Sequence, residues 1–202
     1  MRRKGTKFFL LLGMRNSLFS FPALLFFGVV IECLIAIYFY QAVHEMADAV
    51  RLMARYSGRF SFMLYLISMH WFTRESMHHE SLPITKKWTS IFAVMHLIHF
   101  GFLAYSVHLN DLPIVPLNVA GGMLAYGLIV LYPLFMHTIS RPFFHFFYYY
   151  YVGFVMAMTF ISRIRGKFVG AIPEKFHYLG LALILFFFIR TAVLFYRQYR
   201  EK

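Results

Sequence analysis

Long apolar runs recur from one end of this chain to the other. A helix that crosses the hydrocarbon core of a bilayer needs about 20 mostly apolar residues, and six segments approach or reach that length. We expect these spans at residues 18–40, 60–73, 88–108, 119–139, 143–162 and 178–196. The connections between them are short, so no soluble domain fits anywhere. The runs predict an all-α integral membrane protein, a six-transmembrane-helix bundle forming a single transmembrane domain over residues 1–202.

The composition fits lipid better than water. Of the 202 residues 60% are hydrophobic and 14% are charged, whereas soluble domains carry about 25% charged residues. The net charge of +12 comes from Lys and Arg that flank the apolar runs, which indicates contact with membrane lipid headgroups and no nucleic-acid partner. A single cysteine, Cys33, excludes a disulfide framework within the chain and any zinc or iron–sulfur site built on cysteines.

The distribution of Lys and Arg predicts the orientation. Positive residues gather in short cytoplasmic segments, and more of them fall inside when the N-terminus is placed inside. In that arrangement residues 41–59 and the basic loop 163–175 are outer loops. We therefore expect a multi-pass protein of the cell membrane, a bacterial inner membrane, with both termini cytoplasmic.

Few ionisable side chains fall in the interior of the predicted spans. Placing such a side chain in the hydrocarbon core costs free energy, so each one is a candidate for a functional role. They are Glu32, His70, His96, His99 and Arg190. His96 and His99 are three positions apart and share one helical face. A metal or heme iron could satisfy one nitrogen of such an imidazole, with a neighbouring carbonyl holding the other. The alternative is a histidine that hydrogen-bonds across helices as part of the packing.

The depth of the histidines suits a cofactor. His96 and His99 are expected near mid-membrane, while His70 and His145 fall toward the inner face. An inner cluster of these side chains would suit a porphyrin standing between helices, held by imidazoles from two of them.

Two segments, YSGRFSFMLYLISMHWFT and ITKKWTSIFAVMHLIHFGFLAY, resemble the ferric reductase-like transmembrane family. They are most similar to the heme-binding membrane subunit of bacterial periplasmic methionine sulfoxide reductase systems (the MsrQ/YedZ group). The third-span histidine of that group falls on His99, with His96 one turn away. Its first fifth-span histidine falls on His145, in RPFFHFFYYYYVG. The likeness covers roughly residues 55–196.

The sequence departs from this pattern at two places. The second fifth-span histidine of the group is replaced by Met158, and its second span ends in Thr-Pro where this chain has Thr73-Arg74. Either an outer heme is missing, or a methionine ligates it as in cytochromes c.

The resemblance implies one heme b, or two, with His99 and His145 as axial ligands and His96, His70 and Met158 in reserve. Arg190 would receive a heme propionate or reach toward the headgroups.

The resemblance also implies electron transfer across the membrane. Electrons would come from a quinol or flavoprotein donor and leave to an outer-face redox protein, so the chain would be the electron-transfer membrane subunit of an oxidoreductase system, without a catalytic residue of its own. Glu32 could carry a quinol proton, or pair with Arg190 or a histidine because an unpaired buried charge is costly.

Two other functions are open. An integral membrane di-iron oxidoreductase, of the desaturase or hydroxylase kind, also carries many histidines near one face, but its H-x-x-H-H boxes are absent from this sequence. A heme-free small transporter or assembly factor would use the same polar residues for packing or proton movement.

Overall fold

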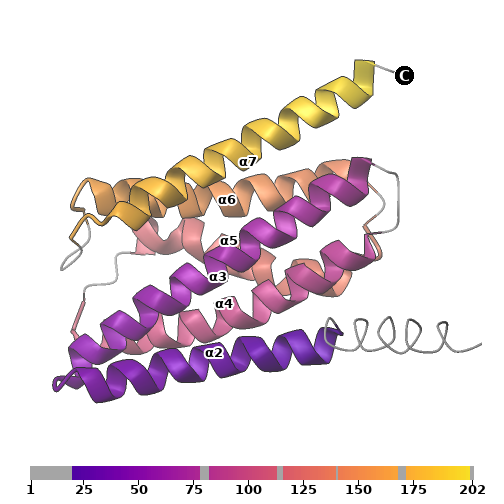
Figure 1. The fold of residues 1–202 in the computed structure, drawn as a ribbon. Coiled ribbons are helices and arrows are strands. Elements are labelled where there is room, and N and C mark those ends of the chain that lie inside the picture. The colour runs from indigo at the N-terminus through magenta and orange to yellow at the C-terminus, as the bar shows by residue number, and fades with distance from the viewer. Residues whose placement is uncertain (1–19, 78–81, 113–115, 140, 168–171, 201–202) are drawn as a thin grey trace, which may run out of the picture. The chain divides into compact units, whose positions relative to one another are not determined.

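The computed structural model describes residues 20–77, 82–112, 116–139, 141–167 and 172–200. Within these ranges the chain is all-helical and forms six helices (Figure 1). They are α2 (Phe21–Ala42), α3 (Met46–Met77), α4 (Pro83–Leu109), α5 (Pro116–Phe135), α6 (Pro142–Ile164) and α7 (Lys175–Arg200). The basic N-terminal tail and part of the basic loop 163–175 lie outside the described residues.

Four of these helices, α2, α4, α6 and α7, are long and apolar enough to cross a membrane. Polar and charged residues interrupt α3, and within α5 the stretch whose side chains the structure describes is Ala120–Phe135, an apolar segment shorter than the four spans. The all-helical prediction is confirmed, and the described residues contain four candidate spans. Six spans stay a prediction.

The start of α3 differs from the sequence prediction. Residues 46–59 were expected in an outer loop, but they continue the helix, which runs over 32 residues. That prediction was wrong because the segment is amphipathic. Ala49, Val50, Met53 and Ala54 are buried while Arg51 is partly exposed, and such spacing needs no continuous apolar run.

The chain divides into two compact units. The first unit comprises residues 1–61 and 94–111, and the second comprises residues 62–93 and 112–202. The first unit therefore contains α2, the first half of α3 and the second half of α4. Its apolar core is formed by Phe39, Ala49, Val50 and Met53, with Phe102 and Leu109 of α4 packed against it.

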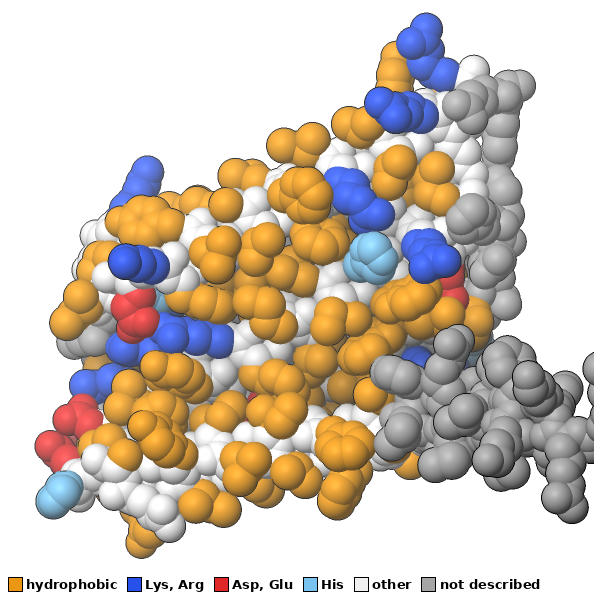
Figure 2. All heavy atoms as spheres, in the orientation of Figure 1, with side chains coloured by type: hydrophobic (Ala, Val, Ile, Leu, Met, Phe, Trp, Pro, Cys, Tyr) orange, Lys and Arg blue, Asp and Glu red, His pale blue; other side chains and the backbone are white. Residues whose placement is uncertain are grey.

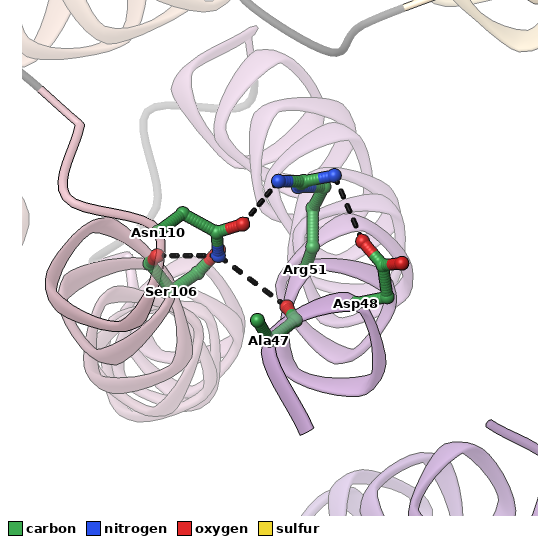
Figure 3. A network of polar contacts seen from close by, with 5 residues as sticks. All are labelled: Ala47, Asp48, Arg51, Ser106 and Asn110. Carbon is green, nitrogen blue, oxygen red and sulfur yellow. Dashed lines mark hydrogen bonds and ion pairs between the residues drawn. The ribbon is translucent and has the colours of Figure 1, made fainter. Parts of the chain in front are cut away.

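A polar network joins the start of α3 to the end of α4 within the first unit (Figure 3). Arg51 donates to Asp48 Oδ1 at 2.9 Å and to Asn110 Oδ1. The Asn110 amide donates in turn to the backbone carbonyls of Ser106, at 2.8 Å, and Ala47, at 3.4 Å. The Asn110 side chain therefore links the last turn of α4 to the first turn of α3.

Aromatic side chains fill the second unit, in which α6 packs against both α5 and α7 (Figure 1). Tyr132 stacks on Tyr148 with ring centroids 3.7 Å apart, and Phe72 stacks on Tyr149 at 4.4 Å. The Tyr65 hydroxyl donates to the Tyr149 carbonyl at 2.7 Å. Large rings bury much apolar area, and their hydroxyls need partners when buried.

A buried carboxylate connects α3 to the first turn of α4. Glu75 is 2% exposed. Its oxygens accept from the backbone N–H of Ile84 at 3.0 Å, the backbone N–H of Thr85 at 2.7 Å and the Thr85 hydroxyl at 2.6 Å. The first N–H groups of a helix have no partner in the helix itself, so Glu75 caps α4 from the end of α3.

We predict that Glu75→Ala lowers the free energy of unfolding by about 1–3 kcal/mol, because it leaves buried N–H groups without an acceptor. Glu75→Gln keeps one acceptor oxygen and should lose less. Thermal unfolding in detergent measures both, with Glu45→Ala at an exposed position as the control. Equal stability of wild type and Glu75→Ala would contradict the capping role.

Candidate functional site

A cluster of polar side chains lies inside the first unit. Its buried members are Glu32 of α2, 2% exposed, Ser57 and Ser61 of α3, both 0% exposed, and His96 of α4, 9% exposed. His99, one turn after His96, completes what we call the polar cluster. Because α2 and α4 are two of the four apolar helices, these groups are placed where water cannot readily solvate them.

Ser61 fixes the ring of His96. The Ser61 hydroxyl donates to the Gly58 carbonyl at 3.2 Å, and Ser61 Oγ lies 2.9 Å from His96 Nδ1. In the tautomer that carries its hydrogen on Nδ1, Oγ accepts from Nδ1–H while the hydroxyl donates to the carbonyl. The neutral imidazole then carries its lone pair on Nε2. Metal-ligating histidines commonly hold this arrangement, with one nitrogen donating to a protein acceptor.

Gly58 makes room for His99. A Cβ atom at position 58 would lie 2.9 Å from Cε1 of His99 and 3.3 Å from each ring nitrogen. The ring centroids of His96 and His99 are 5.2 Å apart. The two imidazoles thus sit together on α4, each against a small residue of α3.

Packing between α2 and α4 sets the position of Glu32 along the helix axis relative to the histidines of α4. A Cβ at Gly28 would come 2.9 Å from Met95 Sδ, and further along both helices Phe39 and Phe102 share one core. The two helices therefore run in the same direction. Glu32 follows Gly28 by one turn, as His99 follows Met95, so the carboxylate and the imidazole lie at the same level.

Ser57 is the polar neighbour of Glu32 across to α3. Both carboxylate oxygens and the Ser57 hydroxyl are buried, and none of them completes a hydrogen bond of normal geometry with another described residue. Buried polar groups usually have a partner. A carboxyl group in this position could hold a proton or bond to a small molecule such as water.

The structure places His145 in the second unit with both ring nitrogens engaged. Nε2 lies 3.1 Å from the Ile139 carbonyl, and Nδ1 lies 2.7 Å from the Tyr132 hydroxyl. The carbonyl can only accept, so Nε2 carries the hydrogen and the Tyr132 hydroxyl donates to the lone pair on Nδ1. As bonded here, His145 offers no lone pair to iron, and it does not fit an axial ligand unless Tyr132 gives way.

The other predicted site residues are also in the second unit. His70 Nδ1 lies 3.5 Å from Nη1 of Arg190, and both side chains are partly exposed. Met158 is 44% exposed on α6. The structure thus brings together His96 with His99, and His70 with Arg190. The pairing of His99 with His145 stays a prediction.

No three His, Cys, Asp or Glu side chains come close enough to hold one metal ion in the part of the chain that the structure describes. No protein-family model matches the chain, and no curated protein or solved structure matches it. The resemblance to the ferric reductase-like family stays a prediction.

Three residues of these sites were not expected from the sequence: Ser57, Ser61 and Tyr132. The two serines did leave a signal, because they are four positions apart and share a helical face with small Gly58 between them. Tyr132 left none, since it is separated from His145 by a turn between helices and the distance between them depends on the fold.

We predict that Gly58→Ala lowers the free energy of unfolding by about 1–3 kcal/mol, because the added methyl group displaces the His99 ring. Gly101→Ala on α4 is the matched control, since nothing lies within 4 Å of a Cβ at that position. An alanine there should leave the stability unchanged or raise it by up to about 1 kcal/mol. Thermal unfolding of both variants in detergent tests the difference.

Proposed function

We propose that this chain is an integral membrane protein that binds heme b and carries electrons across the membrane. The observation that carries the proposal is the pair of imidazoles on α4, His96 buried and His99 half-buried, each seated against a small residue of α3. Intramembrane ionisable residues are costly and mark functional sites. Coordination to the iron of a porphyrin would offset the free-energy cost of placing two histidines among apolar helices.

His96 best fits an axial ligand. Its Nδ1 lies 2.9 Å from Ser61 Oγ, which orients the ring, and in the tautomer with the hydrogen on Nδ1 the lone pair of Nε2 would bind the iron. His99 is the second candidate, because it lies one turn from His96 and its ring packs against Gly58. When bound, heme iron supplies reversible one-electron chemistry. The apolar faces of α2 and α4 would exclude water around it.

The candidate for the second axial ligand of the heme is His145. His145 would take that role only after the Tyr132 hydroxyl leaves Nδ1. The electron donor in this proposal is a membrane quinol or a separate flavoprotein, and the acceptor is an outer-face redox protein, because the sequence has no nucleotide-binding motif of its own.

We predict that the purified protein, supplied with hemin, shows a Soret band that shifts on reduction. His96→Ala should lose most of that band because it removes the oriented imidazole. His108→Ala is the control, since His108 is an exposed residue on the same helix. A colourless wild type, or a band that survives in the His96→Ala/His99→Ala double variant, would contradict heme binding on α4.

His145→Ala separates the two arrangements of the second ligand. Loss of the band in this variant would mean that Tyr132 releases His145 to the iron. An unchanged spectrum together with lower thermal stability would mean that His145 serves to hold the turn between α5 and α6.

The second candidate function is heme-free proton movement. It is favoured by Glu32, whose buried carboxyl group has no ion-pair partner among the described residues. Carboxyl groups and histidines that follow one another inside a bundle form proton relays in pumps and transporters. Glu32, Ser57 and the α4 histidines would be the groups that pass the proton.

Proton flux into liposomes tests this candidate. Glu32→Gln should abolish any flux that the wild type supports, because the amide cannot take up a proton. Glu45→Gln, at an exposed position between α2 and α3, should leave it unchanged. No flux in the wild type, or equal flux in both variants, would exclude the carboxyl group as a carrier.

A further inference from the structure

We propose that the C-terminal halves of α3 and α7 bind the phosphate of an anionic glycerophospholipid. The site consists of His70 and Arg74 of α3 and Arg190 of α7, which we call the basic triad. All three belong to the second unit. The proposal is independent of heme binding.

The fold holds α3 and α7 together beside the triad. Thr73 and Thr191 are both 0% exposed, and their hydroxyls are 2.8 Å apart. One to two turns further along, the Gln198 side chain donates to the Met77 carbonyl at 3.0 Å. Because Arg74 follows Thr73 and Arg190 precedes Thr191, these bonds fix the backbone from which both guanidinium groups extend.

The triad brings two guanidinium groups beside one neutral imidazole, with no carboxylate as counterion in the part of the chain that the structure describes. Arg190 Nη1 lies 3.5 Å from His70 Nδ1, so the guanidinium donates to the lone pair of the neutral imidazole. The Arg74 guanidinium lies over the Trp71 ring, 5.1 Å from its centroid. Among the described residues no carboxylate forms an ion pair with any member of the triad.

The nearest acidic side chain in the sequence does not neutralise the triad. Glu75 is buried, and its oxygens bind the first turn of α4. The two guanidinium groups carry positive charge on neighbouring helices, and a bound anion would offset that charge. Phosphate oxygens accept hydrogen bonds from Arg in the favoured two-pronged geometry.

The surroundings favour a lipid over a free anion. Exposed apolar side chains lie within about one turn of the triad on both helices: Ile67 at 37%, Phe186 at 58%, Ile189 at 63% and Val193 at 42% exposure. Figure 2 shows basic side chains and a histidine set among hydrophobic side chains over this part of α3 and α7. A phospholipid can contact the triad with its phosphate and the apolar side chains with its acyl chains. A free phosphate can contact only the triad.

The position of the triad on its helices supports the same ligand. Arg190 lies ten residues before the end of α7, and His70 lies seven before the end of α3, so these two are about 10–15 Å from the helix ends, while Arg74 is about 5 Å from the end of α3. Long basic side chains at that depth reach toward the headgroups, and basic pockets between membrane helices bind anionic headgroups.

Native mass spectrometry of the heme-free protein tests the proposal with phosphatidylglycerol and phosphatidylcholine of identical acyl chains. The wild type should retain phosphatidylglycerol in preference. Arg190→Gln should reduce that preference roughly fivefold, the effect of removing one charge near the headgroups. Arg200→Gln is the control, because it makes the same change at an exposed position on the same helix.

Each other outcome overturns the proposal. Equal retention of the two lipids by the wild type means that no such site exists. An equal loss in Arg200→Gln means that only general surface charge matters. Displacement of bound phosphatidylglycerol by millimolar inorganic phosphate means a free-anion site. If Arg190→Gln does not fold, Arg74→Gln decides by the same criteria, since Arg74 is exposed and its loss removes no buried contact.

Discussion

The constraint on which this structure depends is the lack of water around its apolar helices. In hydrocarbon every donor and acceptor must find a partner within the protein or in a ligand. Several partners identified here come from a different helix: Ser61 for His96, Tyr132 for His145, and Thr191 for Thr73. Each bond therefore both satisfies a polar group and fixes the distance between two helices.

Small residues make these contacts possible. Gly28 admits the Met95 side chain, and Gly58 admits the His99 ring, so α2, α3 and α4 approach closely at the level of the polar cluster. Membrane helices commonly use small residues in this way, because close backbone approach gains van der Waals contact that lipid tails would otherwise provide. Larger side chains at these two positions would separate the helices and move the histidines.

The sequence was sufficient to predict an all-helical chain, because runs of apolar residues need no tertiary information. It also identified His96, His99 and Glu32 as unusual, since a charge or imidazole within an apolar run is visible without a structure. It failed at the start of α3, where packing against Phe39 and Phe102 stabilises a helix that carries Arg51. The sequence also did not predict the Tyr132–His145 hydrogen bond, because that bond depends on the conformation of the connection between α5 and α6.

Glu75 and Thr85 are separated by ten positions in the chain, and this short separation affects how the protein folds. Closing a loop of that size costs little entropy and takes tens of nanoseconds. The carboxylate can therefore meet the first amides of α4 as soon as both have been synthesised, before α5 to α7 exist. With these amides bonded early, the end of α3 and the start of α4 are suited to pair as one unit before the later helices pack.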